Sequence, residues 1–155
     1  YEQNIILDEP AEVWVTFVHE GAGWLNTLCF YTYDINNPPT SVDDIDTLTI
    51  IFPNFSYDGY GGGLHSGNKV EIGTFPANTV IGWALIAKGW SNHSVTSGSY
   101  INYSNKNLNS ANKQQSILFN DVGRDLFLVG FEDIKRTWNS DEDFNDALFL
   151  SLIHI

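Results

Sequence analysis

Short runs of apolar and β-branched residues recur along the chain, and they do not repeat with the period of a helix. Runs of this kind occupy residues 4–8, 12–19, 27–34, 47–52, 70–75, 80–88, 117–121, 125–131 and 146–154. Gly, Pro, Asn and Asp separate them at intervals of about eight to twelve residues. This spacing predicts an all-β chain of about nine strands, folded as one antiparallel, jelly-roll-like β-sandwich over residues 1–155.

Residues 12–19 are the most regular of these runs. Val13, Val15 and Phe17 alternate with Glu12 and Thr16, but the second face also carries Trp14 and Val18. A strand that is partly apolar on both faces is typical of one packed between two layers. The pattern therefore predicts that Trp14, like Trp83 in the apolar run 80–88, belongs to the core.

Polar residues dominate residues 91–116, where Ser, Asn, Thr, Lys and Gln are interrupted by Tyr100 and Tyr103. We expect a long loop here, with one short strand near residues 99–104. Loops of such length without structure of their own are uncommon in compact domains and are often functional.

Acidic residues are concentrated in Gly130–Phe149. This stretch holds Glu132, Asp133, Asp141, Glu142, Asp143 and Asp146, with only Lys135 and Arg136 as basic partners. Asp141, Asp143 and Asn145 follow a D-x-D-x-N spacing that places side-chain oxygens on one side of an extended chain. Carboxylates packed in this way repel one another, and Ca²⁺, which takes six to eight oxygen ligands, relieves that repulsion.

The two halves of this acidic stretch flank a predicted hairpin. Antiparallel pairing of 125–131 with 147–153 would bring Glu132 and Asp133 opposite residues 141–146, with Phe131 and Phe144 anchoring the motif in the core. The stretch is not an EF-hand, because loop positions six and twelve are Asp146 and Leu152 instead of Gly and Glu. Mg²⁺ is less favoured because it keeps more of its water. The alternative is a solvated acidic turn whose side chains cap backbone amides.

Several segments together resemble a bacterial extracellular domain of unknown function found in LruC-type surface proteins. They are His19–Asn26, Phe30–Tyr33, Lys69–Gly73, Ile81–Trp83, Gly130–Asp133 and Ser140–Asp146. The resemblance implies a secreted or cell-surface protein with other domains, a calcium ion bound by the acidic motif, and no known reaction. On that pattern Glu20 and Asn26 add metal ligands from a neighbouring strand end; alternatively, Glu20 only orients the turn.

Composition narrows the classes of partner and of location that fit this chain. A net charge of -12, from 19 acids and 7 bases, argues against nucleic acid and against anionic membrane surfaces as partners. No apolar run is long enough to span a membrane as a helix. The single Cys29 lies in an apolar run and is expected to be buried, and a chain that begins at Tyr1 and contains no Met is expected to be a mature or trimmed fragment.

No catalytic residue is predicted. The four histidines lack zinc-type spacing, and no G-x-S-x-G motif is present. Aromatic side chains in predicted loops are candidates for stacking on a ligand such as a glycan, namely Tyr57, Tyr60, Trp90, Tyr100 and Tyr103. The sequence thus favours a non-catalytic, calcium-binding module for adhesion or ligand recognition. A purely structural spacer and a polysaccharide hydrolase are the alternatives.

Overall fold

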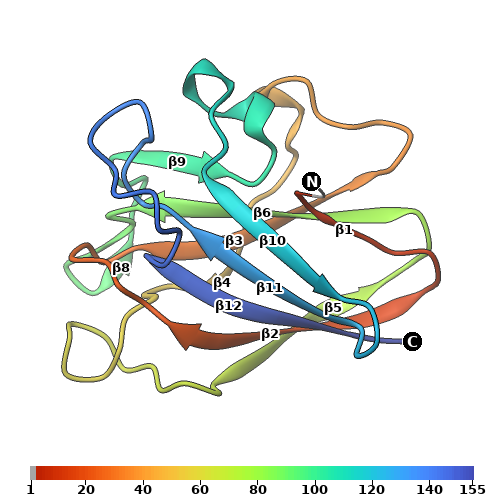
Figure 1. Cartoon of the computed structure of the whole chain (residues 1–155), viewed down its shortest axis with the longest axis horizontal. Coiled ribbons are helices and arrows are strands. Elements are labelled where there is room, and N and C mark those ends of the chain that lie inside the picture. Colours follow the sequence, from red (N-terminus) through yellow and green to blue (C-terminus); the bar gives the residue numbers. More distant parts are fainter. Residues whose placement is uncertain (1–2) are drawn as a thin grey trace.

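The computed structural model describes residues 3–155, and these form two five-stranded antiparallel sheets (Figure 1). In the first sheet the order is β1–β6–β3–β4, with β9 beside β6. Its strands are β1 (Ile5–Ile6), β3 (Thr27–Asp34), β4 (Thr49–Phe52), β6 (Thr79–Ala87) and β9 (Tyr100–Tyr103). The second sheet has the order β10–β11–β12–β2–β5. Its strands are β2 (Ala11–His19), β5 (Lys69–Phe75), β10 (Ser116–Asp121), β11 (Leu126–Phe131) and β12 (Ala147–His154).

The main core lies between the two sheets and takes side chains from both. Phe17, Phe131 and Phe149 from the second sheet are fully buried, and they share one cluster with Trp83 and Leu85 from β6. The Trp83 ring packs edge-on against Phe149, with centroids 5.1 Å apart. The prediction of an antiparallel β-sandwich is confirmed at this level, and so is the core position of Trp83.

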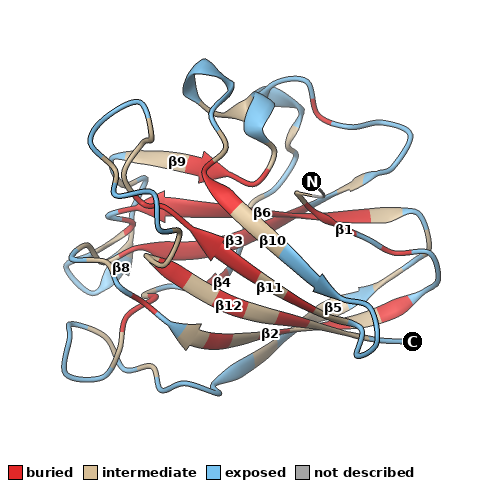
Figure 2. Ribbon diagram, in the orientation of Figure 1, coloured by how far each residue is buried: buried red, intermediate tan, exposed pale blue. Residues whose placement is uncertain are grey.

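The first sheet is buried on both of its faces. A second cluster, built on Cys29, Tyr31, Ala84 and Tyr103, covers its outer side, and Leu108 packs against that cluster. Figure 2 shows β6 as an almost continuously buried strand. This explains why residues 80–88 are apolar without alternation. Cys29 is buried and free, as its apolar surroundings predicted.

The second sheet is covered on one face only. Along β2, buried and half-buried positions alternate, and Trp14 lies on the outer, half-buried face. Its ring lies under Lys69, with the ammonium 5.3 Å from the ring centroid, and its indole nitrogen donates to Glu12. The prediction that Trp14 belongs to the core is therefore wrong: the indole shields a lysine stem instead of filling the space between the sheets.

The strand count also differs from the expected nine. A two-stranded ribbon, β7 (Trp90–Ser91) and β8 (Ser94–Val95), forms where a loop was expected. Three short 3₁₀ turns complete the fold, η1 (Val42–Asp44), η2 (Lys106–Leu108) and η3 (Ser110–Asn112). The short strand predicted near 99–104 is present as β9. Among residues 3–155 no helix is long and apolar enough to cross a membrane.

Candidate metal centre

The acidic stretch connects β11 to β12, as the sequence predicted. These strands pair antiparallel, with Phe131 opposite Ala147, so residues 132 and 146 leave the sheet side by side. A Cβ on Gly130 would clash with the carbonyl oxygen of Phe144, which shows how closely the loop folds back over the strand. Only glycine permits this approach, and it sets the position of the acidic residues that follow.

Three carboxylates converge in this loop. Oxygen atoms of Glu132, Asp141 and Asp143 all lie within 4.8 Å of one another. Glu132 is buried, whereas Asp141 and Asp143 are exposed. Two oxygens bound to one Ca²⁺ at about 2.3–2.6 Å are at most about 5 Å apart. The three oxygens are therefore spaced as ligands of a single ion would be.

Hydrogen bonds from the loop hold Glu132 in place. Ser140 Oγ donates to Glu132 Oε2 at 2.6 Å, and the Phe144 amide donates to Oε1 at 2.5 Å. Asn145 Nδ2 donates to Asp143 Oδ2 at 2.6 Å. Positive φ angles at Glu142 (59°) and Phe144 (56°) are unfavourable for residues other than glycine. The loop thus keeps a costly backbone conformation while placing its acids together.

Phe144 does not anchor the loop in the core, which corrects the prediction from sequence. Its side chain is half-buried and lies beneath the Arg136 guanidinium, 5.2 Å from the ring centroid. Phe131 is fully buried, as expected. Residue 144 has a left-handed backbone and lies before β12, which begins at Ala147. The alternation of a strand therefore does not direct its side chain into the core.

A second group of predicted ligands is joined by hydrogen bonds around Asp133, and most of its members are buried. Asn26 Nδ2 donates to Asp133 Oδ2 at 2.9 Å, and the Asp133 amide donates to Asp146 Oδ2 at 2.9 Å. Glu20, Asn26 and Asp133 are all less than 10% exposed, at 8%, 1% and 4%. Glu20 Oε2 has no hydrogen-bond partner among the described residues. A buried carboxylate oxygen without a protein partner is costly while it is charged, and a bound cation would offset that cost.

The electrostatics of this second group reflect the crowding of acids. Burial, together with the charges of Asp133 and Glu132, raises the pKa of Asp146 to about 7, although the hydrogen bond from the Asp133 amide acts in the opposite direction. Burial also raises the pKa of Glu20, and the Asp133 charge adds to that effect. Both shifts indicate carboxylates that lack a compensating positive charge.

The two basic residues in the stretch do not supply that charge to the converging acids. Arg136 pairs with Glu142 at 3.2 Å and donates to the backbone oxygen of Gln114. Lys135 lies over the Tyr100 ring, with its ammonium 4.6 Å from the centroid. Apart from Glu142, the acids of the stretch therefore form no ion pair among residues 3–155.

Asn26 and Asn145 mainly position other groups. The Asn26 Oδ1 accepts from the Lys88 amide at 3.0 Å while its Nδ2 binds Asp133. The backbone oxygen of Asn145 accepts from the Gly21 amide at 3.0 Å. The turn before β3 is thereby joined to the acidic loop, so Glu20 and Asn26 lie beside the acidic residues although more than 100 residues separate them in sequence.

The aromatic candidates divide between the core and the surface. Tyr103 is buried in the second cluster against Tyr31, which corrects its prediction as a ligand contact. Tyr57 is half-buried and packs edge-on against Phe17, while Tyr60 is 77% exposed. Trp90 is half-buried in the β7–β8 ribbon.

Tyr100 lies next to the acidic site. Its hydroxyl donates to the Asp133 carbonyl at 2.9 Å. Trp24 and Trp138 contact its ring from two sides, at centroid distances of 6.5 and 5.5 Å. The sequence places these two tryptophans, like the five aromatic candidates, in or beside predicted loops.

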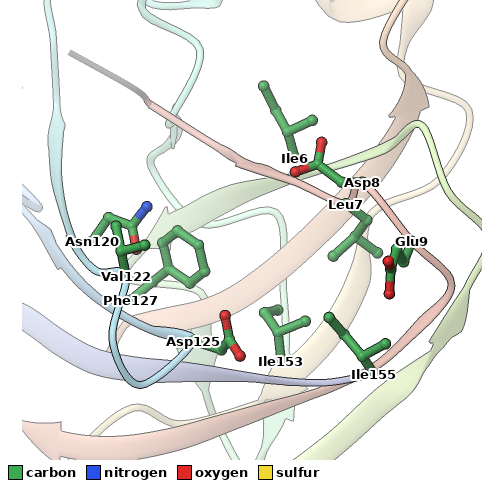
Figure 3. Close-up of a pocket in the computed structure, with 10 residues that line it drawn as sticks. All are labelled: Ile6, Leu7, Asp8, Glu9, Asn120, Val122, Asp125, Phe127, Ile153 and Ile155. Atoms are coloured by element: carbon green, nitrogen blue, oxygen red, sulfur yellow. The ribbon is translucent and has the colours of Figure 1, made fainter.

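A separate cavity of about 420 Å³ lies at the other end of β11 (Figure 3). Its lining combines apolar and acidic side chains: Ile6, Leu7, Asp8, Glu9, Asn120, Val122, Asp125, Phe127, Ile153 and Ile155. Among residues 3–155, the carboxylates close enough together to hold a metal ion are Glu132, Asp141 and Asp143. None of these three lines the cavity. The cavity is thus distinct from the metal centre.

Comparison with protein families gives one match. Residues 75–151, just under half of the chain, match the model of a family described as a domain of unknown function (DUF4114). The matched segment includes β6, β11, most of β12 and the whole acidic loop, but not Glu20 or Asn26. No curated protein and no solved structure matches the chain.

Proposed function

We propose that this chain is a non-catalytic, calcium-binding β-sandwich module of a secreted or cell-surface bacterial protein, acting in adhesion or ligand recognition. The convergence of oxygens from Glu132, Asp141 and Asp143 within 4.8 Å carries the proposal. The ligands envisaged are glycans or other surface molecules, and further domains of a larger surface protein are the expected neighbours.

Calcium suits the donor set better than other biological cations. Every candidate ligand is an oxygen, which excludes the nitrogen and sulfur chemistry that zinc prefers. Asp141 and Asp143 are exposed, so water completes a coordination shell of six to eight around a bound ion. The ion would relieve repulsion at Glu132 and tie the loop to the end of β11. A cation bound only by the folded chain raises its free energy of unfolding.

The unpartnered Glu20 oxygen gives independent support. Glu20 is only 8% exposed, and burial is the main cause of its raised pKa, to which the charge of Asp133 adds. The chain has a single cysteine and therefore no intrachain disulfide. Calcium would supply the cross-link between distant segments that disulfides supply in many secreted domains.

A recognition role is favoured over a purely structural spacer by aromatic exposure. Trp138 is 58% exposed and Tyr60 is 77% exposed, although both have large apolar surfaces. A non-catalytic role is favoured because both Glu132 oxygens already accept hydrogen bonds from the loop. These hydrogen bonds hold the carboxylate in one position within the loop instead of leaving it free to turn toward a substrate.

Calorimetric titration of the metal-free protein with Ca²⁺ tests the calcium claim. We expect a saturable heat and a melting temperature that rises with calcium concentration, since occupancy at one hundred times Kd adds about 2.7 kcal/mol to the free energy of unfolding. Mg²⁺ at the same concentration serves as the control and should give a smaller rise. A titration with no heat and no change in melting temperature would overturn the proposal.

A further inference from the structure

Three aromatic rings form a continuous row beside the metal centre. Tyr100 lies in the middle, and both indoles are nearly perpendicular to it, at 71° for Trp24 and 89° for Trp138. Tyr100 is fixed by its hydrogen bond to the Asp133 carbonyl. The row therefore joins the turn before β3, the start of β9 and the acidic loop, three segments far apart in the sequence.

Two lysines lie on this row, which we call the aromatic row. The Lys88 ammonium is 4.3 Å from the Trp24 ring centroid, and the Lys135 ammonium is 4.6 Å from Tyr100 and 5.5 Å from Trp138. Neither lysine forms an ion pair among residues 3–155, although the chain carries a net charge of -12. Cation–π contacts hold the two ammonium groups at the surface without neutralising them.

We propose that the aromatic row binds an acidic saccharide, of the uronic acid class. This inference rests on the proposed function and names the ligand of the same module. The exposed C–H face of a pyranose ring packs on an indole, and Trp138 offers a 58% exposed one. The carboxylate of the uronate accepts charge-assisted hydrogen bonds from Lys88 and Lys135. Rings that alternate with free cations match a ligand that alternates between apolar faces and carboxylates.

Calcium and the acidic saccharide should bind with positive coupling. In the metal-free protein the carboxylates of Asp133 and Asp146 lie beside the row, since the Tyr100 hydroxyl donates to the Asp133 carbonyl at 2.9 Å and the Asp133 amide donates to Asp146 Oδ2 at 2.9 Å. These charges repel an anionic ligand. A bound Ca²⁺ offsets them and holds the loop that carries Lys135 and Trp138. The ion thus favours the ligand without needing to contact it, and the reverse follows by linkage.

The test is titration of the calcium-loaded protein with an oligoglucuronate, followed by tryptophan fluorescence and calorimetry. The methyl ester of the same oligosaccharide keeps the ring faces and removes the charge. We expect saturable binding of the acid, at least tenfold weaker binding of the ester, and loss of binding in a calcium chelator. An acidic glutamate peptide is the competing class of ligand, and we expect it to bind more weakly than the saccharide.

Two variants and one control assign the site. Trp138→Ala and Lys135→Gln should each weaken oligoglucuronate binding at least tenfold while retaining calcium binding. Phe119→Ala, which removes an aromatic side chain that is 60% exposed on β10, should leave it unchanged. Calcium binding is measured first on each sample, so a failure of the proposed function is seen separately. A calcium-loaded protein that ignores the oligoglucuronate, or binds acid and ester equally, or prefers the peptide, would overturn the inference.

Discussion

Gly21 lies directly against Asn145, so that a Cβ at residue 21 would come within 2.5 Å of Asn145 Oδ1. The Gly21 amide also donates to the Asn145 carbonyl at 3.0 Å. This contact joins the turn that carries Glu20 to the loop that carries Asp141 and Asp143. It makes the candidate metal centre a junction between two distant segments, so one bound ion would stabilise both of them.

Gly21→Ala should separate these two segments. We expect a loss of about 1–3 kcal/mol in the free energy of unfolding, because the added methyl overpacks the junction, and weaker calcium binding. Chemical denaturation with and without calcium measures both effects. Gly23→Ala is the matched control, since nothing lies within 4 Å of a Cβ there. Equal stability of the two variants would contradict the role given to the junction.

Asp143→Asn should weaken calcium binding on the order of tenfold or more, because affinity at oxygen sites follows the number of ligand charges. The amide keeps the shape of the side chain but removes its charge. Calorimetry measures the affinity, and Asp46→Asn provides a control at an exposed acid outside the loop. The account would be wrong if both variants bound calcium as the unaltered protein does.

Asp146→Asn should stabilise the metal-free protein at pH 8 more than at pH 5, because the loss that it removes grows between pH 3.8 and about 7. Burial beside Asp133 and Glu132 raises the pKa of Asp146 from its ordinary 3.8 to about 7 in the folded chain. A raised acid pKa means that the folded chain binds the proton more tightly, so its contribution to stability is present below 3.8 and is lost as pH rises through 7. The asparagine variant escapes this loss.

Urea denaturation in a calcium chelator at the two pH values measures the effect. The quantity to compare is the difference in unfolding free energy between Asp146→Asn and the unaltered protein, because the contributions of distant titrating groups cancel in it. A difference that is the same at pH 5 and pH 8 would refute the assignment of the raised pKa to this carboxylate.

Cys29 should report global opening of the fold. Its side chain is 1% exposed, and burial raises the pKa of its thiol to about 12. Because the thiolate is the reactive form, we expect no alkylation by iodoacetamide at pH 8 until the first sheet opens. Mass spectrometry follows the modification. Calcium should slow it further, whereas protein unfolded in urea should react completely; rapid labelling of the folded protein would contradict the buried position.

Much of the fold follows from local sequence pattern. The run predicted at residues 27–34 is strand β3. The run at 80–88 begins and ends one residue later than β6, and the run at 125–131 begins one residue earlier than β11. Apolar runs bounded by turn residues mark strands reliably when the strand is paired with another strand on each side. The antiparallel pairing of β11 with β12 also followed, because a loop of polar residues joins two apolar runs.

Features that depend on partners far away in the sequence did not follow. Trp14 was expected in the core because its strand is apolar on both sides, yet only one face of β2 meets another layer. Tyr103 was expected at the surface because its neighbours are polar, yet η2 and the residues before β4 cover it. In both cases tertiary packing decides the burial, and residue type alone does not reveal which face is covered.

The candidate site was predicted only in part. The acidic residues of the loop and their convergence could be expected from their spacing, and the structure brings Glu20 and Asn26 beside them. The separation into one group around Glu132 and another around Asp133 depends on hydrogen bonds that no spacing encodes. The two lysines of the aromatic row were not predicted as ligand contacts, because Lys88 stands alone in an apolar run and Lys135 lies within the acidic stretch.

A crystal structure of the protein grown with calcium tests the central claim most directly. We predict one ion bonded to oxygens of Glu132, Asp141 and Asp143 at about 2.3–2.6 Å, with water completing its shell. Anomalous scattering identifies the element. Density that shows these three carboxylates hydrogen-bonded to protein and water alone, at saturating calcium, would contradict the account.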